Sequence, residues 1–157
     1  MHITRAGRVV YVGQWIAAIV LPAWFFFGRG LVGAEIGLPL WALLVYGIVV
    51  VAVFLVPSVI TLFDREVRGE GATRLGYSVA SWVLWIAVLL AALVVPDQAD
   101  GAPLDSALTA WTDDALTQQA SDVIFVVLAG LIGLAYLAVF ILAIVGVTRS
   151  REVSATD

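Results

Sequence analysis

The 157-residue chain contains no cysteine and no lysine, and its single histidine is His2. The absence of cysteine excludes disulfides, thiolate metal sites and cysteine nucleophiles. With its only histidine next to the N-terminus, the chain has none in its apolar runs to ligate a haem. We therefore expect no cofactor and no resident metal.

Charge is also scarce, since 13% of the residues are charged and 62% are hydrophobic. Soluble proteins carry about 25% charged residues. Four long runs lack Asp, Glu, Lys and Arg altogether, and about 20 apolar residues suffice to cross a bilayer. The sequence predicts an all-α polytopic integral membrane protein, a bundle of four transmembrane helices. The whole chain, 1–157, forms one membrane domain with spans at about 9–27, 38–63, 76–95 and 123–147.

The arginines predict the orientation of the chain in the membrane. Seven of the eight fall in the two tails and the 64–75 loop, and only Arg29 lies on the opposite side. Short basic loops stay in the cytoplasm. We therefore expect a multi-pass protein of the plasma membrane with both termini cytoplasmic. The first run begins as a signal peptide would, but its length favours an uncleaved span.

The 96–122 loop on the outer side holds six aspartates and no basic residue. Leu104, Leu108, Trp111 and Ala115 recur at helical spacing, which predicts an amphipathic helix at about 104–119. Such a helix either covers the outer end of the bundle or docks a partner. The aspartates match no known calcium loop, so a solvated acidic surface is favoured over a cation site.

Polar side chains from three predicted spans share one depth. Counting from the cytoplasmic ends at 1.5 Å per residue places five of them in one layer of the inner half. These residues are Gln14, Ser58, Thr61, Ser78 and Ser81. Polar groups in lipid seek one another, which favours hydrogen bonding between helices. The alternative is a small ligand pocket or vestibule open to the cytoplasm.

Several finer contacts also follow from spacing. Glu70 and Arg74 have the spacing of a helical ion pair, and Tyr77 fits an aromatic belt at the inner interface. Trp85 and Tyr136 fall near the midplane, where a mutual contact would satisfy both polar atoms. The glycines at 130 and 133 mark the fourth span as a central helix or an oligomer interface.

The spans offer only hydroxyls and one amide, with no base, nucleophile or metal ligand, so we expect no enzyme activity. No basic patch with interleaved aromatics indicates nucleic-acid binding. We interpret the chain as a non-enzymatic structural or accessory subunit of a homo- or hetero-oligomeric membrane complex. Its partners would be the lipid bilayer and copies of itself or other membrane subunits. The alternative is a component of a small-molecule transporter or channel that uses the polar layer.

Overall fold

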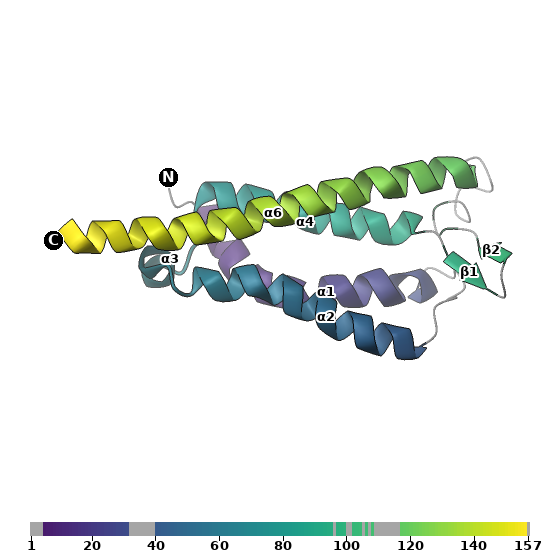
Figure 1. The fold of residues 1–157 in the computed structure, drawn as a ribbon, viewed down its shortest axis with the longest axis horizontal. Coiled ribbons are helices and arrows are strands. Elements are labelled where there is room, and N and C mark those ends of the chain that lie inside the picture. Colours follow the sequence, from purple (N-terminus) through teal and green to yellow (C-terminus); the bar gives the residue numbers. More distant parts are fainter. Residues whose placement is uncertain are drawn as a thin grey trace.

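The computed structural model describes residues 5–31, 40–95, 97–99, 102–104, 106, 108 and 117–156. Over these residues the chain is almost wholly helical (Figure 1). The helices are α1 (Arg5–Leu31), α2 (Leu40–Thr61), α3 (Arg65–Glu70), α4 (Leu75–Val94) and α6 (Gln118–Thr156). Strands β1 (Asp97–Ala99) and β2 (Ala102–Leu104) form an antiparallel hairpin in which Gln98 is opposite Pro103.

Three helices are long and apolar enough to cross a membrane. They are the segments Ala6–Phe27 of α1, Leu75–Val94 of α4 and Gln118–Arg151 of α6. This finding confirms three of the predicted membrane helices and identifies a membrane-embedded protein. In α2 the described apolar stretch, Val45–Thr61, is shorter than the other three.

Contacts between chain segments define the two ends of the bundle. The backbone N–H of Thr73 donates to the carbonyl of Gly7 over 3.0 Å, so α1 and α4 begin side by side. Further along, the Trp24 indole donates to the carbonyl of Leu89 over 3.3 Å, which shows that α1 and α4 run parallel. Asp64 lies against Gly146, which brings the later part of α6 to the same end. We call this the α3 end.

The opposite end carries the β1–β2 hairpin, and we call it the hairpin end (Figure 1). Here the Ser121 hydroxyl, near the start of α6, donates to the carbonyl of Val94 at the end of α4 over 3.4 Å. The first turn of α1 and the last turn of α6 both lie at the α3 end in Figure 1. Helices α2 and α6 therefore run from the hairpin end to the α3 end, antiparallel to α1 and α4.

In Figure 1, α1 and α2 lie on one side of the bundle and α4 and α6 on the other, and we call these the two helix pairs, although α4 also packs extensively against α1. The pairs lie close together at the α3 end and diverge toward the hairpin end. The shared core includes Val10 of α1, Leu84 and Val88 of α4, and Val139 of α6. Within the most apolar stretch of each helix, 50% of the residues of α4 are buried, against 11% in α6. The central helix is therefore α4, so a central position for α6 is wrong.

The connections differ from their predictions. The 64–75 loop contains the short helix α3, and α6 begins at Gln118 within the predicted 96–122 loop. Of the amphipathic helix predicted at 104–119, Leu104 belongs to β2 and residues 118–119 belong to α6. Most of the positions between them, Trp111 included, lie outside the described residues.

Two caps explain why α3 forms between charged residues. Asp64 has an extended backbone, and its carboxylate accepts hydrogen bonds from the backbone N–H groups of Glu66 and Val67. This is the usual role of Asp at a helix N-terminus. The helix ends at Gly71, whose φ of 60° is the left-handed conformation that glycine adopts without strain.

Candidate functional site

Gln14 is the centre of a polar cluster in which three helices meet. Its side-chain amide nitrogen donates to the Thr61 hydroxyl of α2 over 3.3 Å. Its amide oxygen accepts from the Tyr77 hydroxyl of α4 over 2.8 Å. The side chain is 4% exposed, so both ends of a buried amide have partners. Such pairing offsets the cost of placing an amide in an apolar interior.

The neighbouring hydroxyls bond mainly to helix carbonyls. Thr61 donates to the carbonyl of Ser58 over 2.7 Å, and Ser81 donates to the carbonyl of Tyr77 over 2.8 Å. Hydroxyls in helices commonly bond back to the preceding turn in this way. The structure thus brings together Gln14, Ser58, Thr61 and Ser81 of the predicted layer.

Ser78, the fifth predicted residue, belongs to a separate network at the start of α1 and α4. Its hydroxyl lies 2.8 Å from the Thr73 hydroxyl and donates to the carbonyl of Arg74 over 3.1 Å. The Thr73 hydroxyl also lies 3.1 Å from the carbonyl of Gly7, to which it donates. This network joins the first turn of α4 to α1.

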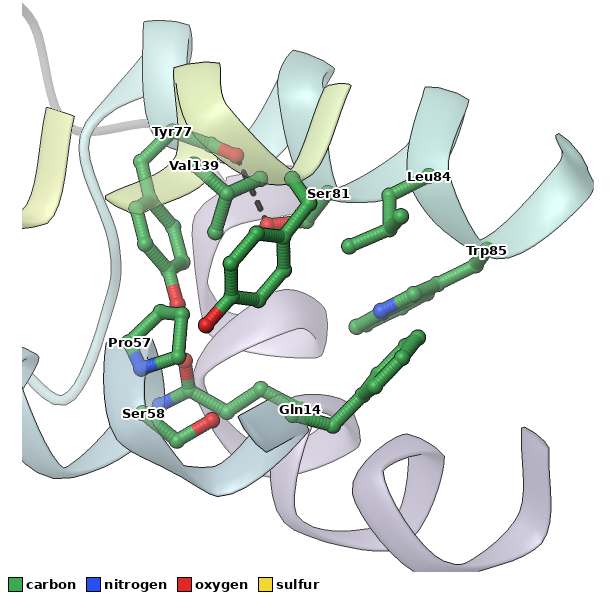
Figure 2. Close-up of a pocket in the computed structure, with 10 residues that line it drawn as sticks. Gln14, Pro57, Ser58, Tyr77, Ser81, Leu84, Trp85 and Val139 are labelled. Carbon is green, nitrogen blue, oxygen red and sulfur yellow. Dashed lines mark hydrogen bonds between the residues drawn. The ribbon is translucent and has the colours of Figure 1, made fainter. Parts of the chain in front are cut away.

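A small cavity adjoins the polar cluster. Its lining includes Gln14, Ser58, Tyr77, Ser81, Trp85 and Tyr136. Figure 2 shows Gln14, Ser58 and Tyr77 gathered at one side of the cavity, with Leu84 and Trp85 at the other. The space open to the centre of a water molecule is about 20 Å³. That is room for a water, whereas pockets for small molecules span about 300–1,000 Å³.

A buried ion pair lies just beyond the polar cluster, at the α3 end. The Arg74 guanidinium is 3.1 Å from the Asp64 carboxylate, and the two side chains are 9% and 2% exposed. Arg74 also pairs with Glu66, whose side chain is half exposed. The same Asp64 carboxylate caps α3, so one group holds both the short helix and the start of α4.

The pKa of Arg74 is shifted by opposing causes. Burial alone lowers the pKa of the guanidinium, but the hydrogen bond and negative charge of Asp64, together with those of Glu66, outweigh burial and raise the pKa above its ordinary value. A raised pKa extends the charged range of a cation to higher pH. Arg74 therefore stays protonated at every pH at which the protein is handled.

Two glycines allow neighbouring helices to approach this ion pair. A Cβ at position 146 would lie 2.6 Å from the Asp64 carboxylate oxygen, too close for a real contact. A Cβ at position 7 would overlap the backbone carbonyl of Thr73. Helix α6 can thus pack against Asp64, and α1 against Thr73, because neither helix presents a side chain there.

Three finer predictions do not hold. Arg74 pairs with Asp64 and Glu66, not with Glu70, because α3 ends at Glu70 and a new helix starts after Arg74. Tyr77 is 4% exposed, so it is a core residue and not part of an aromatic belt.

The predicted contact between Trp85 and Tyr136 also gives way to other partners. The Tyr136 hydroxyl donates to the carbonyl of Val53 over 3.0 Å, and the Trp85 ring packs edge-on against Trp82. The two side chains share only the lining of the small cavity.

The sequence interpretation missed Asp64, Thr73 and Arg74 as structural residues, because a charged loop normally stays in solvent. Signals were present: Asp64 directly precedes a short charged segment, and Gly71 follows it, as at the two ends of a helix. Within the described ranges no cluster of three or more His, Cys, Asp or Glu side chains could hold a metal ion. Four of the six aspartates of the predicted outer loop, Asp100, Asp105, Asp113 and Asp114, lie outside those ranges.

Comparisons with family models, with curated proteins and with solved structures found no match. Any function must therefore be inferred from the geometry of this chain itself.

Proposed function

We propose that the chain is a non-enzymatic subunit of an oligomeric membrane complex and associates through the exposed face of α6. In this proposal it crosses the plasma membrane four times, with the α3 end in the cytoplasm. The observation that carries the proposal is a pair of glycines on α6, the least buried of the three helices long enough to cross a membrane, at a place where no other described helix touches them.

The direction of the helices supports α2 as the fourth span. Helices α1 and α4 run parallel, so the chain must return from the hairpin end to the α3 end between them. Helix α2 makes that return over 22 residues, which at 1.5 Å per residue reach ~33 Å. That length matches the ~30 Å hydrocarbon core of a bilayer.

The distribution of arginine supports the orientation. Exposed arginines lie in α3 and near the α3-end termini of α1 and α6, namely Arg8, Arg65, Arg68, Arg149 and Arg151. Clustering of basic residues on one side of a short-looped membrane protein favours the cytoplasm for that side.

The exposed face of α6 supports association. Val126 and Leu134 are 68% and 70% exposed, and Gly130 lies between them at helical spacing. A Cβ built at Gly130 or Gly133 would have no described neighbour within 4 Å. Each glycine costs a helix roughly 0.5–1 kcal/mol relative to alanine. In membranes that cost is offset where small residues let a second helix approach closely.

The polar cluster supports a structural role better than a transport role. Gln14 has partners at both ends of its amide, and the adjoining cavity of about 20 Å³ is sized for water. A transport site would need a larger space or polar groups left open for a substrate. We therefore assign this cluster to holding the α3 end of the bundle together.

The test is the assembly state of the full chain extracted in mild detergent. We expect an assembly larger than the 16.7 kDa monomer, either of this chain alone or with another membrane protein. Gly130→Leu should dissociate it, because a leucine would block close approach of a second helix. The matched control is Gly69→Leu, since Gly69 on α3 also has open space around it.

The outcome that contradicts the proposal is equally direct. If the native chain is monomeric at every mild extraction condition, or if Gly130→Leu leaves the assembly intact, the face of α6 is not an interface.

A further inference from the structure

A second and larger cavity lies where the two helix pairs diverge toward the hairpin end. It measures about 260 Å³, more than ten times the space beside Gln14. Its walls come from all four long helices, including Pro22 and Phe26 of α1, Val50 of α2, Val88 of α4 and Phe125 and Ala129 of α6. Every lining residue is apolar.

The lining excludes most occupants. Water does not fill a purely apolar cavity, and a polar ligand would lose its hydrogen bonds there. A transmembrane helix is about 10–12 Å across, so a helix from another chain is too thick for this space. If the cavity were empty, all the side chains that line it would lose van der Waals contacts. What remains is a thin, flexible and wholly apolar occupant.

The shape and position of the cavity fit a hydrocarbon chain. On α6 its wall runs from Phe125 to Ile132, seven residues or ~10 Å along the helix axis. This length lies within the apolar part of three helices that are long enough to cross a membrane. Phe54 lines both this cavity and the small polar one, so an aromatic ring separates the apolar space from the Gln14 cluster.

The cavity reaches the surface at Ala129 of α6, an exposed residue in its lining, and a second apolar groove adjoins it. This groove lies between α1 and α2, measures about 340 Å³, and shares Pro22 and Phe26 with the larger cavity as common walls. Its other lining residues include Ile48, which is 70% exposed. A hydrocarbon chain can therefore enter from the bilayer beside Ala129 and meet only apolar side chains inside.

We infer that this cavity binds one acyl chain of a bilayer phospholipid, wedged between the α1–α2 and α4–α6 pairs. The site recognises the hydrocarbon and not the headgroup, because its lining offers no polar partner. The inference is independent of association through α6, since Phe125 and Val50 face the cavity whereas Gly130 and Leu134 lie on the exposed face.

The test counts phospholipids that stay with the full chain during extraction from vesicles of dioleoyl phosphatidylglycerol into mild detergent, by native mass spectrometry. We expect one tightly held phospholipid per chain. Vesicles of dioleoyl phosphatidylcholine should give the same result, because the acyl chains of the two phospholipids are identical. Ala129→Phe should lower the retained fraction by about tenfold or more, since a bulky ring takes the place of buried methylenes.

Two further variants make the result decisive. Val50→Phe fills the cavity from α2, far from the exposed face of α6, and should lower retention even if Ala129→Phe impairs assembly or folding. Ala52→Phe adds the same ring to the exposed side of α2, outside the cavity lining, and should retain lipid as the native chain does. Folding of each variant is checked by helical circular dichroism.

The inference is overturned if the native chain carries no phospholipid after extraction. It is also overturned if the folded Ala129→Phe and Val50→Phe variants retain as much lipid as Ala52→Phe, or if retention follows the headgroup instead of the cavity.

Discussion

At the scale of single residues, the described core is organised around two buried polar anchors. Gln14 bonds to Thr61 and Tyr77, and Arg74 bonds to Asp64 and Glu66. Both anchors join α4 to other segments of the chain. A buried polar group is costly when unpaired, so each anchor favours one arrangement of the helices over arrangements that leave it without a partner.

Gln14→Leu should weaken the fold without abolishing insertion. The change removes two hydrogen bonds and leaves the Tyr77 hydroxyl without its acceptor. Hydrogen bonds between helices in membranes average about 0.6 kcal/mol, so we expect a loss of about 1–2 kcal/mol in the free energy of unfolding. The measurement is unfolding in mixed micelles, with Ile16→Leu on the exposed side of α1 as the control. Native stability in Gln14→Leu would show that the cluster is not an anchor.

Arg74→Met should be the more damaging change. It leaves the Asp64 carboxylate buried without its counter-charge, which we expect to lower the free energy of unfolding by about 3 kcal/mol. Adding Asp64→Asn should recover part of the loss, because asparagine keeps the helix cap without the charge. The same unfolding assay measures both.

The control for Arg74→Met is Arg68→Met on the exposed surface of α3, which should change stability by less than about 0.5 kcal/mol. Equal effects of the two arginine substitutions would mean that the buried pair contributes nothing.

At the scale of elements, the close packing at the α3 end depends on glycine. Gly7→Ala should separate α1 from α4, because the new methyl group overlaps a backbone carbonyl that cannot move aside. We expect a loss of about 1–3 kcal/mol, the usual range for overpacking. The control is Gly69→Ala, which meets nothing within 4 Å and should leave stability unchanged or slightly higher. A harmless Gly7→Ala in micelle unfolding would contradict the tight junction of α1 and α4.

The elements also show what could be predicted from the sequence. The charge-free runs predicted α1, α2 and α4 with ends close to those observed, since a helix in an apolar run pairs all its own backbone groups. Depth counting along those helices predicted that Gln14 and Thr61 lie near one another. Both predictions use only periodicity and length.

What was missed depends on contacts between distant segments. Position along the chain cannot reveal that Arg74 turns inward to Asp64, or that Tyr77 reaches Gln14 across the bundle. The divergence of the helix pairs, and with it the large apolar cavity, is likewise a property of the packed bundle. The predicted central position of α6 was also wrong. A single sequence does not distinguish glycines on an exposed helix face from glycines at a buried helix contact.

At the scale of the whole molecule, the bundle is tight at one end and open at the other. The α3 end combines the hydrogen bonds of Gln14, the Asp64–Arg74 pair and two glycine contacts. The hairpin end contains the apolar cavity and the unpartnered glycines of α6. In our proposals, the tightly packed α3 end holds the fold, and the open hairpin end takes up lipid and a second helix.

The proposed topology can be tested by cysteine labelling. The chain has no cysteine of its own, so an introduced cysteine is the only site that a thiol reagent can label. Single cysteines at Arg68 on α3 and at Gln119 near the start of α6 would report the two ends of the bundle, and both positions are exposed. A thiol reagent that cannot cross membranes, applied to intact cells, should label Gln119→Cys. It should label Arg68→Cys only after the membrane is permeabilised.

This labelling pattern tests the central claim most directly, namely four crossings with the α3 end in the cytoplasm. If α2 did not cross, the chain would present position 68 to the outside and position 119 to the inside. Labelling of Arg68→Cys in intact cells, with Gln119→Cys protected, would therefore contradict the account.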